Sequence, residues 1–263
     1  MSTPSEFLTE MFGLSGQVAV VIGGTGVLGG ALAEGIAQAG ATTVVAGRSQ
    51  ERGQARVKTI ESRGGRGAFL AVEADQRASV QALLEATLAQ FGQCDILVNC
   101  AGTNSAIPYA QITDEQWHSV IDSQLTATHL GCQIFAPYMA AQAGGGSILN
   151  IGSVTSHLPL SRVFAYSAAK AAVVNLTQNL AREFAPRNVR VNVLCPGFFP
   201  AEQNRKILDA ERVAGIMRGT PMARFGEPEE LVGAALLLLS RRAGSFITGE
   251  DLYVDGGFTS MRF

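Results

Sequence analysis

A tyrosine and a lysine four residues apart are the pair in this sequence best suited to acid–base chemistry. Only three of the 20 basic residues are lysines, and one of them, Lys170, follows Tyr166 at helical spacing. Side chains four residues apart share one face of a helix, so the two groups would be neighbours. An ammonium beside a phenol favours the phenolate and lowers the phenol pKa toward neutral pH, where the group can exchange a proton. We therefore interpret Tyr166 and Lys170 as catalytic residues.

A glycine-rich turn near the N-terminus predicts a dinucleotide-binding site. An apolar run at 18–22 is followed directly by Gly-Gly-Thr-Gly-Val-Leu-Gly-Gly. Its spacing Gly-x-Gly-x-x-Gly, between a strand and a helix, is that of the dinucleotide fingerprint. Glycines let backbone amides approach a pyrophosphate, and the helix N-terminus adds partial positive charge. The expected cofactor contacts in this turn are Gly23, Thr25, Gly26, Val27, Leu28 and Gly29.

The end of the second predicted strand indicates which dinucleotide is bound. An NAD-preferring site places a carboxylate there for the ribose 2′-hydroxyl, whereas this strand ends in Ala-Gly-Arg48-Ser49. Arg48 offers a fork of donors and Ser49 a hydroxyl, and both suit a 2′-phosphate. We therefore expect NADP(H) to be preferred over NAD(H). Asp75, after the third strand, is a candidate acceptor for the adenine amino group, with a turn or cap role as the alternative.

Seven apolar runs separated by helix-length segments must position these groups. The runs are nearly continuous rather than alternating, which is typical of parallel strands covered on both faces. Amphipathic spacing predicts helices between them, at 31–39, 78–91, 114–141 (as two helices) and 164–185. The alternation predicts an α/β fold with a doubly wound, Rossmann-type parallel sheet of about seven strands in a single domain spanning 1–263. The strands are expected at 18–22, 42–46, 68–72, 96–98, 147–151, 190–194 and 252–254, and loose surface at 1–15 and 63–67.

Composition excludes several classes of function. With 263 residues, 47% of them hydrophobic, the chain can bury one large core, and a net charge of −2 disfavours nucleic-acid binding. The longest apolar run spans nine residues, 231–239, against about 20 needed to cross a bilayer, and the first residues lack the basic and apolar regions of a secretory leader. The cysteines and histidines show no metal-binding spacing. We expect a cytoplasmic protein without membrane, nucleic-acid or metal partners.

Several motifs, in order along nearly the whole chain, resemble the short-chain dehydrogenase/reductase family. Ser153 lies thirteen residues before Tyr166, after the predicted fifth strand, and Asn99-Cys-Ala101-Gly102 resembles the NNAG motif of the family. The segment 192–197 resembles its N-x-x-x-P-G segment, and 226–230, 248–249 and 254–257 resemble its C-terminal signature.

The resemblance implies roles for these residues. Ser153 would hold and polarise the substrate oxygen, Tyr166 would pass the proton as hydride moves to or from the nicotinamide, and Lys170 would hold the nicotinamide ribose. The resemblance also implies a homotetramer. Further implied cofactor contacts are Asn99, Ala101, Gly102, Pro196, Gly197 and Phe199.

The chain departs from the family pattern at three places. Val27 replaces a glycine of the cofactor turn, and Ala201 replaces a threonine beside the nicotinamide. Gln124 replaces an asparagine that, in the family, fixes a helix kink and helps to hold a proton-relay water. Because glutamine has the same amide on one more methylene, we retain Gln124 as a candidate catalytic residue.

The polarity of the segment 198–219, where the family carries its substrate lid, favours a small hydroxylated or carboxylated carbonyl compound over a fatty acyl chain. The stretch 196–206 (PGFFPAEQNRK), followed by 220–226 (Thr-Pro-Met-x-Arg-Phe-Gly), also resembles sugar-acid reductases of the fructuronate/mannonate type. We therefore expect hydride transfer between NADP(H) and a secondary alcohol or ketone, on a sugar or sugar acid. The alternatives are a 3-oxoacyl thioester or simple ketone reductase, and a non-catalytic NADP(H)-sensing protein. Candidate substrate residues are Asn104, His157, Arg162, Asn204 and Arg205.

Overall fold

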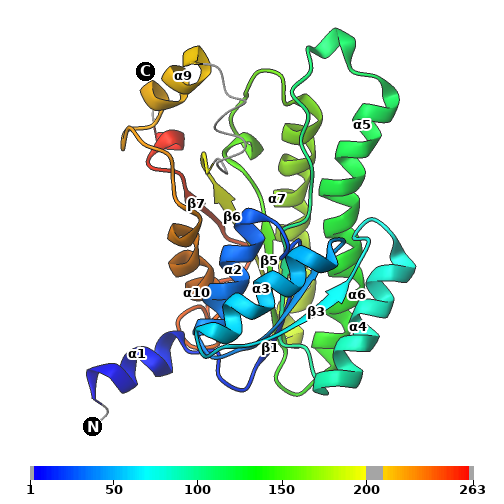
Figure 1. Cartoon of the computed structure of the whole chain (residues 1–263), viewed down its shortest axis with the longest axis vertical. Coiled ribbons are helices and arrows are strands. Elements are labelled where there is room, and N and C mark those ends of the chain that lie inside the picture. The colour runs from blue at the N-terminus through cyan, green and yellow to red at the C-terminus, as the bar shows by residue number, and fades with distance from the viewer. Residues whose placement is uncertain (1–2, 200–209, 261–263) are drawn as a thin grey trace.

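The computed structural model describes residues 3–199 and 210–260, and in them a seven-stranded parallel sheet forms the centre of the molecule (Figure 1). The strand order is β3-β2-β1-β4-β5-β6-β7, and every neighbouring pair is parallel. The predicted doubly wound α/β fold is therefore confirmed. The strands are β1 (Val18–Ile22), β2 (Thr42–Gly47), β3 (Arg66–Ala71), β4 (Ile96–Asn99), β5 (Gly146–Ile151), β6 (Val189–Pro196) and β7 (Asp251–Val254).

Helices cover both faces of the sheet, because each face carries its own apolar core. On one face, side chains of β1 and β2 pack with α4, α6 and α7. On the other face, the same strands pack with α2, α3 and α10. The helices are α1 (Pro4–Phe12), α2 (Val27–Gln38), α3 (Gln50–Ser62), α4 (Arg77–Phe91), α5 (Asp114–Ile121), α6 (Ala127–Ala141), α7 (Phe164–Phe184), α9 (Ala210–Gly219) and α10 (Val232–Leu239).

Short helical segments complete the connections. The 3-10 turns are η1 (Tyr109–Gln111), η3 (Val154–Ser156), η4 (Ala185–Arg187), η5 (Pro228–Leu231) and η6 (Phe258–Ser260). A single π-helical turn, η2 (Asp122–Thr126), separates α5 from α6, so the predicted division of 114–141 into two helices is confirmed.

The sheet order places the ligand-binding edge. Strand β1 lies between β2 and β4. After β1 the chain continues toward the β3 edge of the sheet, and after β4 it continues toward the β7 edge. In open α/β sheets ligands bind in the crevice outside the carboxyl ends of the strands at such a switch point. The glycine turn after β1 and the segment after β4 both begin at this crevice.

Two segments expected to be loose surface are ordered. Residues 4–12 form α1, which begins with a reciprocal capping box between Thr3 and Glu6 and projects from the body of the molecule (Figure 1). Strand β3 begins at Arg66, inside the expected 63–67 loop, because its edge position needs only one hydrogen-bonded neighbour, β2. Helix α3 was not expected; it begins at a Ser49 cap and covers β3, with Gly53 giving room for the Phe69 ring.

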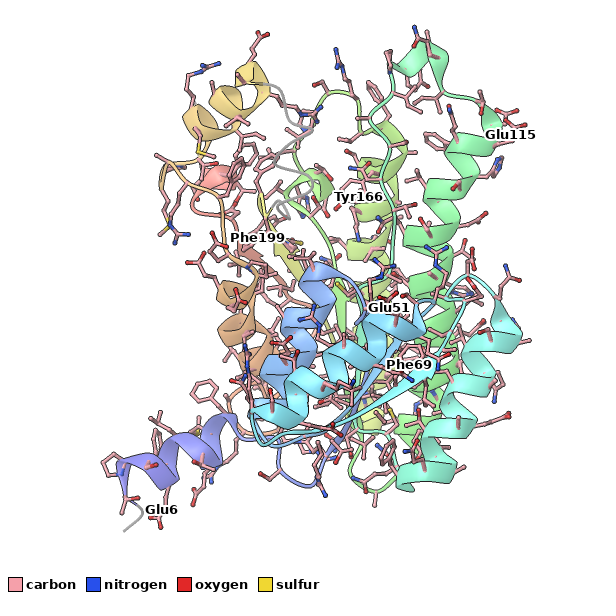
Figure 2. The ribbon with its side chains drawn as sticks, viewed as in Figure 1. Glu6, Glu51, Phe69, Glu115, Tyr166 and Phe199 are labelled. Carbon is pink, nitrogen blue, oxygen red and sulfur yellow. The ribbon has the colours of Figure 1, made fainter. Side chains whose placement is uncertain are left out.

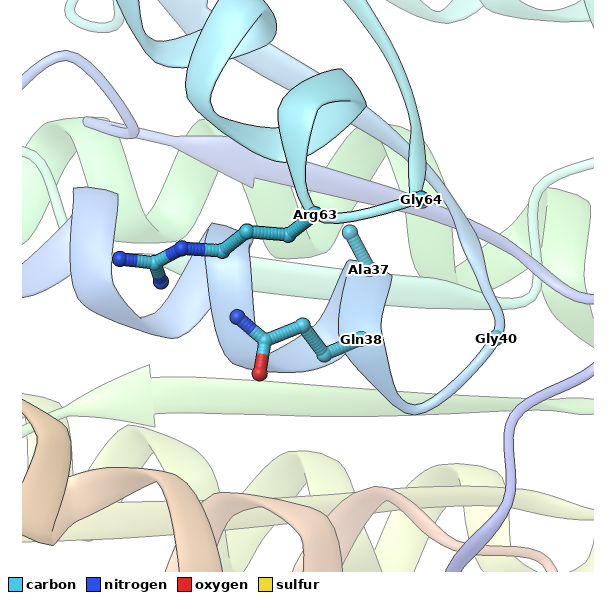
Figure 3. A pocket seen from close by; sticks show the side chains of 6 residues that line it. Ala37, Gln38, Gly40, Arg63 and Gly64 are labelled. Carbon is cyan, nitrogen blue, oxygen red and sulfur yellow. The ribbon is translucent and has the colours of Figure 1, made fainter.

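One surface pocket lies at the opposite end of the sheet from this crevice. It has a volume of about 580 Å³ and lies between the ends of α2 and α3, where the chain enters β2 and β3 (Figure 3). Its one charged lining residue, Arg63, pairs with Glu34 of α2 at 2.8 Å. The pocket therefore reflects the packing of two helix ends at the amino edge of the sheet, where this fold does not bind its ligands.

No helix in the two described ranges combines the length and the apolar character that crossing a bilayer requires. Within the same ranges, His, Cys, Asp and Glu side chains form no group of three or more that could hold a metal ion.

Candidate active site

A cleft of about 740 Å³ opens along the carboxyl ends of the central strands. It extends from the glycine turn after β1 to α9, and its walls come from the segments that follow β1, β4, β5 and β6. Tyr166 and Phe199, which both line it, lie at the end of the sheet nearest α9 (Figure 2). The fold thus brings residues distant in the sequence to one cavity.

The glycine turn is packed too closely for side chains. Gly23 has φ +88°, and a Cβ there would lie 2.6 Å from the backbone of Cys100 and Ala101. A Cβ on Gly29 would lie 2.3 Å from the Gly23 carbonyl oxygen. Helix α2 begins at Val27 without a side-chain cap, so its first amides point into the cleft end where a pyrophosphate would lie. This cradle fits a dinucleotide.

Most of the expected dinucleotide contacts line the cleft, and five do not: Thr25, Arg48, Ser49, Asp75 and Asn99. Those that line it are Gly23, Gly26, Val27, Leu28, Gly29, Ala101, Gly102, Pro196, Gly197 and Phe199. Three of the five others lie beyond the cleft, where the adenosine half of a dinucleotide would extend. Arg48 and Ser49 follow β2, and Asp75 follows β3; Arg48 and Asp75 are exposed. Asn99 is buried beneath the cleft, and its amide donates to Asn150 Oδ1 at 2.9 Å, tying β4 to β5.

Thr25 and Ser49 have local contacts of their own. The Thr25 side chain packs against Gly47, where a Cβ would lie 2.5 Å from Thr25 Oγ1. The Ser49 hydroxyl caps α3 by accepting a hydrogen bond from Arg52 N at 3.3 Å. Because the oxygen accepts, the hydroxyl hydrogen of Ser49 remains a donor for a phosphate oxygen.

Ser153, Tyr166 and Lys170 all line the cleft. Ser153 follows β5, its hydroxyl accepts from Thr155 N at 3.1 Å, and its side chain lowers the pKa of Tyr166. One turn along α7, the Lys170 Nζ lies 5.5 Å from the Tyr166 ring centroid and donates to the Ile151 carbonyl at 2.6 Å. The end of β5 and the start of α7 therefore fix a serine hydroxyl, a phenol and an ammonium beside one another.

The protonation of this group differs from the sequence-based expectation. Burial raises the pKa of Tyr166, and the Ser153 side chain only partly opposes the rise. Burial also lowers the pKa of Lys170 to about 8, because few groups compensate for its lost hydration. In the protein alone, Tyr166 is therefore poised as a proton donor, and the ammonium is the group whose charge changes near neutral pH.

Gln124 lies in the π-helical turn η2 and lines the cleft. Its Nε2 donates to the Thr103 carbonyl at 2.8 Å, while its buried Oε1 has no partner in the described chain. Its main-chain carbonyl accepts from Thr128 Oγ1 at 2.7 Å. The kink is thus present with glutamine in place of asparagine, and the side-chain amide holds the segment after β4.

The candidate substrate residues separate into three groups. Asn104 and Arg162 line the cleft. His157 does not; its Nε2 lies 2.8 Å from Asp251 Oδ2 on β7, so the side chain is turned toward the sheet edge. Asn204 and Arg205 fall outside the described residues, as does Ala201. Of the expected lid, Phe198, Phe199 and residues of α9 line the cleft.

Several residues that line the cleft were not predicted from the sequence. Cys100 lines the cleft as a protonated thiol, since burial raises its pKa to about 11. Arg212 and Ile216 reach the cleft from α9, Thr155 lines it from η3, and Phe225 lines it from a loop. Only the spacing of Arg212 and Ile216, four residues apart on an amphipathic segment, carried a signal that could have revealed this.

Comparisons with known proteins agree with this architecture. A family model described as enoyl-(acyl carrier protein) reductase matches residues 25–259. An oxidoreductase of uncharacterised function from Bacillus subtilis, UxuB, is 36% identical, with 93% of this chain and 95% of that protein covered.

Two solved structures are similar over almost their full length. A gluconate 5-dehydrogenase from Burkholderia cenocepacia, in complex with NADP and tartrate, has a TM-score of 0.92 at 33% identity, covering 97% of this chain and 100% of that one. A Haemophilus influenza protein assigned as a D-mannonate oxidoreductase, with bound NAD, has a TM-score of 0.89 at 30% identity, covering 97% and 99%. The fold, the dinucleotide cradle and these matches together show that the chain belongs to the short-chain dehydrogenase/reductase family, as an oxidoreductase that uses a nicotinamide dinucleotide.

Proposed function

We propose that this protein interconverts a secondary alcohol and a ketone on a sugar or sugar acid, with NADP(H) preferred over NAD(H). The observation that carries the proposal is the Ser153–Tyr166–Lys170 arrangement beside a dinucleotide cradle. When bound, the nicotinamide ring supplies or accepts the hydride. The sugar-type substrate is supported by the similarity to a gluconate 5-dehydrogenase.

The roles of the three residues follow from their contacts. The Thr155 amide fills one acceptor site of the Ser153 hydroxyl, so the hydroxyl hydrogen can be donated to the substrate oxygen. Tyr166, which lines the cleft together with Ser153, would give its proton to that same oxygen during ketone reduction and take one back during alcohol oxidation. Lys170, held by the Ile151 carbonyl, would bind the nicotinamide ribose and add positive charge beside the phenol.

The preference for NADP(H) rests on the end of β2. Residues 46–49 contain no carboxylate, and the exposed Arg48 makes no hydrogen bond or ion pair within the described chain. A guanidinium and the Ser49 hydroxyl at this place would bind a 2′-phosphate, which a carboxylate would repel. The similar D-mannonate oxidoreductase with bound NAD is the reason to test both cofactors.

A pH profile tests the role of Lys170. We expect kcat/KM for NADPH to be nearly constant around pH 7 and to fall as the pH rises through about 8, where Lys170 becomes neutral. The ratio kcat/KM reports ionisations of the free protein. In a Lys170→Met variant we expect lower activity and no fall near pH 8. A fall near pH 8 that persists in this variant would assign the ionisation to another group.

A substrate panel tests the function as a whole. We expect NADPH oxidation with keto sugars or keto sugar acids at a kcat/KM at least about tenfold above that with simple ketones and 3-oxoacyl thioesters. The thioester arm is included because the matching family model is described by an acyl-carrier-protein reductase. Turnover of thioesters alone would replace our proposal by that second function. Dinucleotide binding without turnover of any substrate would indicate a protein that senses NADP(H) instead of an enzyme.

We propose further that the protein is a cytoplasmic homotetramer.

A further inference from the structure

The charged groups that line the cleft all have one sign. Among the described lining residues, Arg162, Lys170 and Arg212 are basic and none is Asp or Glu. The chain as a whole has 22 acidic and 20 basic residues, so this distribution does not follow from composition. A cleft with one sign of charge and apolar walls concentrates ligands of the opposite charge. Lys170 belongs to the catalytic group, whereas Arg162 and Arg212 lie outside it.

Arg162 is held at the mouth of the cleft by an unusual backbone. Its φ is +66°, a conformation that residues other than glycine rarely adopt, and its carbonyl accepts a hydrogen bond from Ile107 N at 3.1 Å. The bond ties the segment before α7 to the segment after β4, and residues of both segments line the cleft. Arg162 also lies only four residues before Tyr166. Its exposed side chain lines the same cleft as Tyr166.

Arg212 approaches the cleft from another element, α9. Arg212 is half-buried, Ile216 is 7% exposed, and both residues line the cleft from one face of the helix. Helix α9 lies beyond the carboxyl end of the sheet and far along it from α2 (Figure 1). Arg218 of the same helix is exposed and is not among the lining residues.

The two arginines are separated from the expected place of the cofactor phosphates. The pyrophosphate cradle is the glycine turn at the start of α2. Arg162, in contrast, lies just before α7, which carries Tyr166, and Arg212 lies in α9. The neutral polar groups in this part of the lining, such as Asn104, Ser153 and Thr155, suit hydroxyl groups. A guanidinium binds a carboxylate through two parallel hydrogen bonds, which a neutral sugar cannot replace.

We propose that Arg162 and Arg212 form a carboxylate-binding subsite, so that the substrate is an acidic, polyhydroxylated ketone or alcohol rather than a neutral sugar. This inference rests on the proposed function and narrows its substrate to the anionic class. The substrate carboxylate would bind at the α9 end of the cleft. A carbonyl or alcohol carbon further along the substrate's carbon chain would then lie beside Ser153 and Tyr166.

A matched pair of substrates tests the subsite. We expect the wild-type protein to reduce a keto-hexonate with a kcat/KM about 10- to 100-fold above that for the ketohexose of the same length. Arg162→Ala and Arg212→Ala should each lower kcat/KM for the acid about tenfold or more, while kcat/KM for the neutral ketohexose stays within about twofold. Arg218→Ala, on the same helix but outside the cleft, should leave both values unchanged. Equal losses for the acid and the neutral sugar would overturn the proposal.

Two binding measurements separate this inference from the proposed function and from a cofactor role. The Kd of NADPH should change less than about twofold in both arginine variants, and a tenfold weakening would assign the arginines to the cofactor phosphates. Tartrate should bind the protein–NADP complex at least about tenfold more tightly than the neutral tetritol of the same carbon number, and this difference should disappear in both variants. Such binding without reduction of any sugar would preserve the subsite and refute the proposed function. Reduction of the acidic and the neutral sugar at equal rates would support the proposed function and refute the carboxylate-binding subsite.

Discussion

Replacing Tyr166 with Phe is expected to lower kcat by about a thousandfold or more, while the Kd of NADPH changes less than about threefold. The phenol lines the cleft together with Ser153, and general acid–base catalysis by a positioned group contributes about 10²- to 10⁴-fold. Phenylalanine retains the ring packed near Lys170 and removes only the oxygen. Steady-state kinetics with the best substrate of the panel, together with fluorescence titration of NADPH, would measure both quantities.

A second tyrosine provides the control for this substitution. Tyr109 is 69% exposed on η1, does not line the cleft and contacts Phe164 through its ring alone. Tyr109→Phe should therefore retain kcat within about twofold. If Tyr166→Phe also retained kcat within a factor of ten, the proton would have to come from another group, and the proposed mechanism would be wrong.

Replacing Arg48 with Ala is expected to raise KM for NADPH about 10- to 100-fold, with KM for NADH changed less than about threefold. Hydrogen bonds between charged groups contribute about 1.5–3 kcal/mol each, which corresponds to roughly 10- to 150-fold in affinity. The 2′-phosphate is the only group that distinguishes the two cofactors, so the effect should be confined to NADPH. Steady-state kinetics with each cofactor at saturating substrate would measure it.

Lys58, exposed two turns further along α3, offers a matched control for the loss of one positive charge. Lys58→Ala should leave both KM values within about twofold. Ser49→Ala should weaken NADPH binding and also destabilise the start of α3, because its hydroxyl caps that helix. Equal changes in KM for NADPH and NADH in Arg48→Ala would contradict the proposed preference.

Local patterns in the sequence predicted much of the fold. The continuous apolar runs became the parallel strands, and the amphipathic segments expected at 78–91 and 164–185 became α4 and α7. The prediction failed for α3, which carries few apolar residues and therefore little hydrophobic periodicity. It also failed for α1, although Phe7, Leu8, Met11 and Phe12 share one helical face there; none of them is buried, so this helix adds nothing to the core of the described structure.

The sequence by itself determined which residues are adjacent in the cofactor turn and on the first turns of α7. Gly23 to Gly29 and the pair Tyr166 and Lys170 are related by spacings of seven residues or fewer, and such spacings are fixed by strand, turn and helix geometry alone. The serine thirteen residues upstream followed from the family resemblance.

Only the tertiary structure decided which side chains from distant segments meet at the cleft. His157 turns toward Asp251 on β7, 94 residues later in the chain, while Arg212 reaches the cleft from α9. The orientation of a loop side chain depends on the partners that packing brings to it, and these partners lie far away in the sequence. For the same reason the pKa of Lys170 could not be predicted: its spacing from Tyr166 is local, but its burial results from the packing of α7 against β5 and β6, with Cys100 after β4 also nearby.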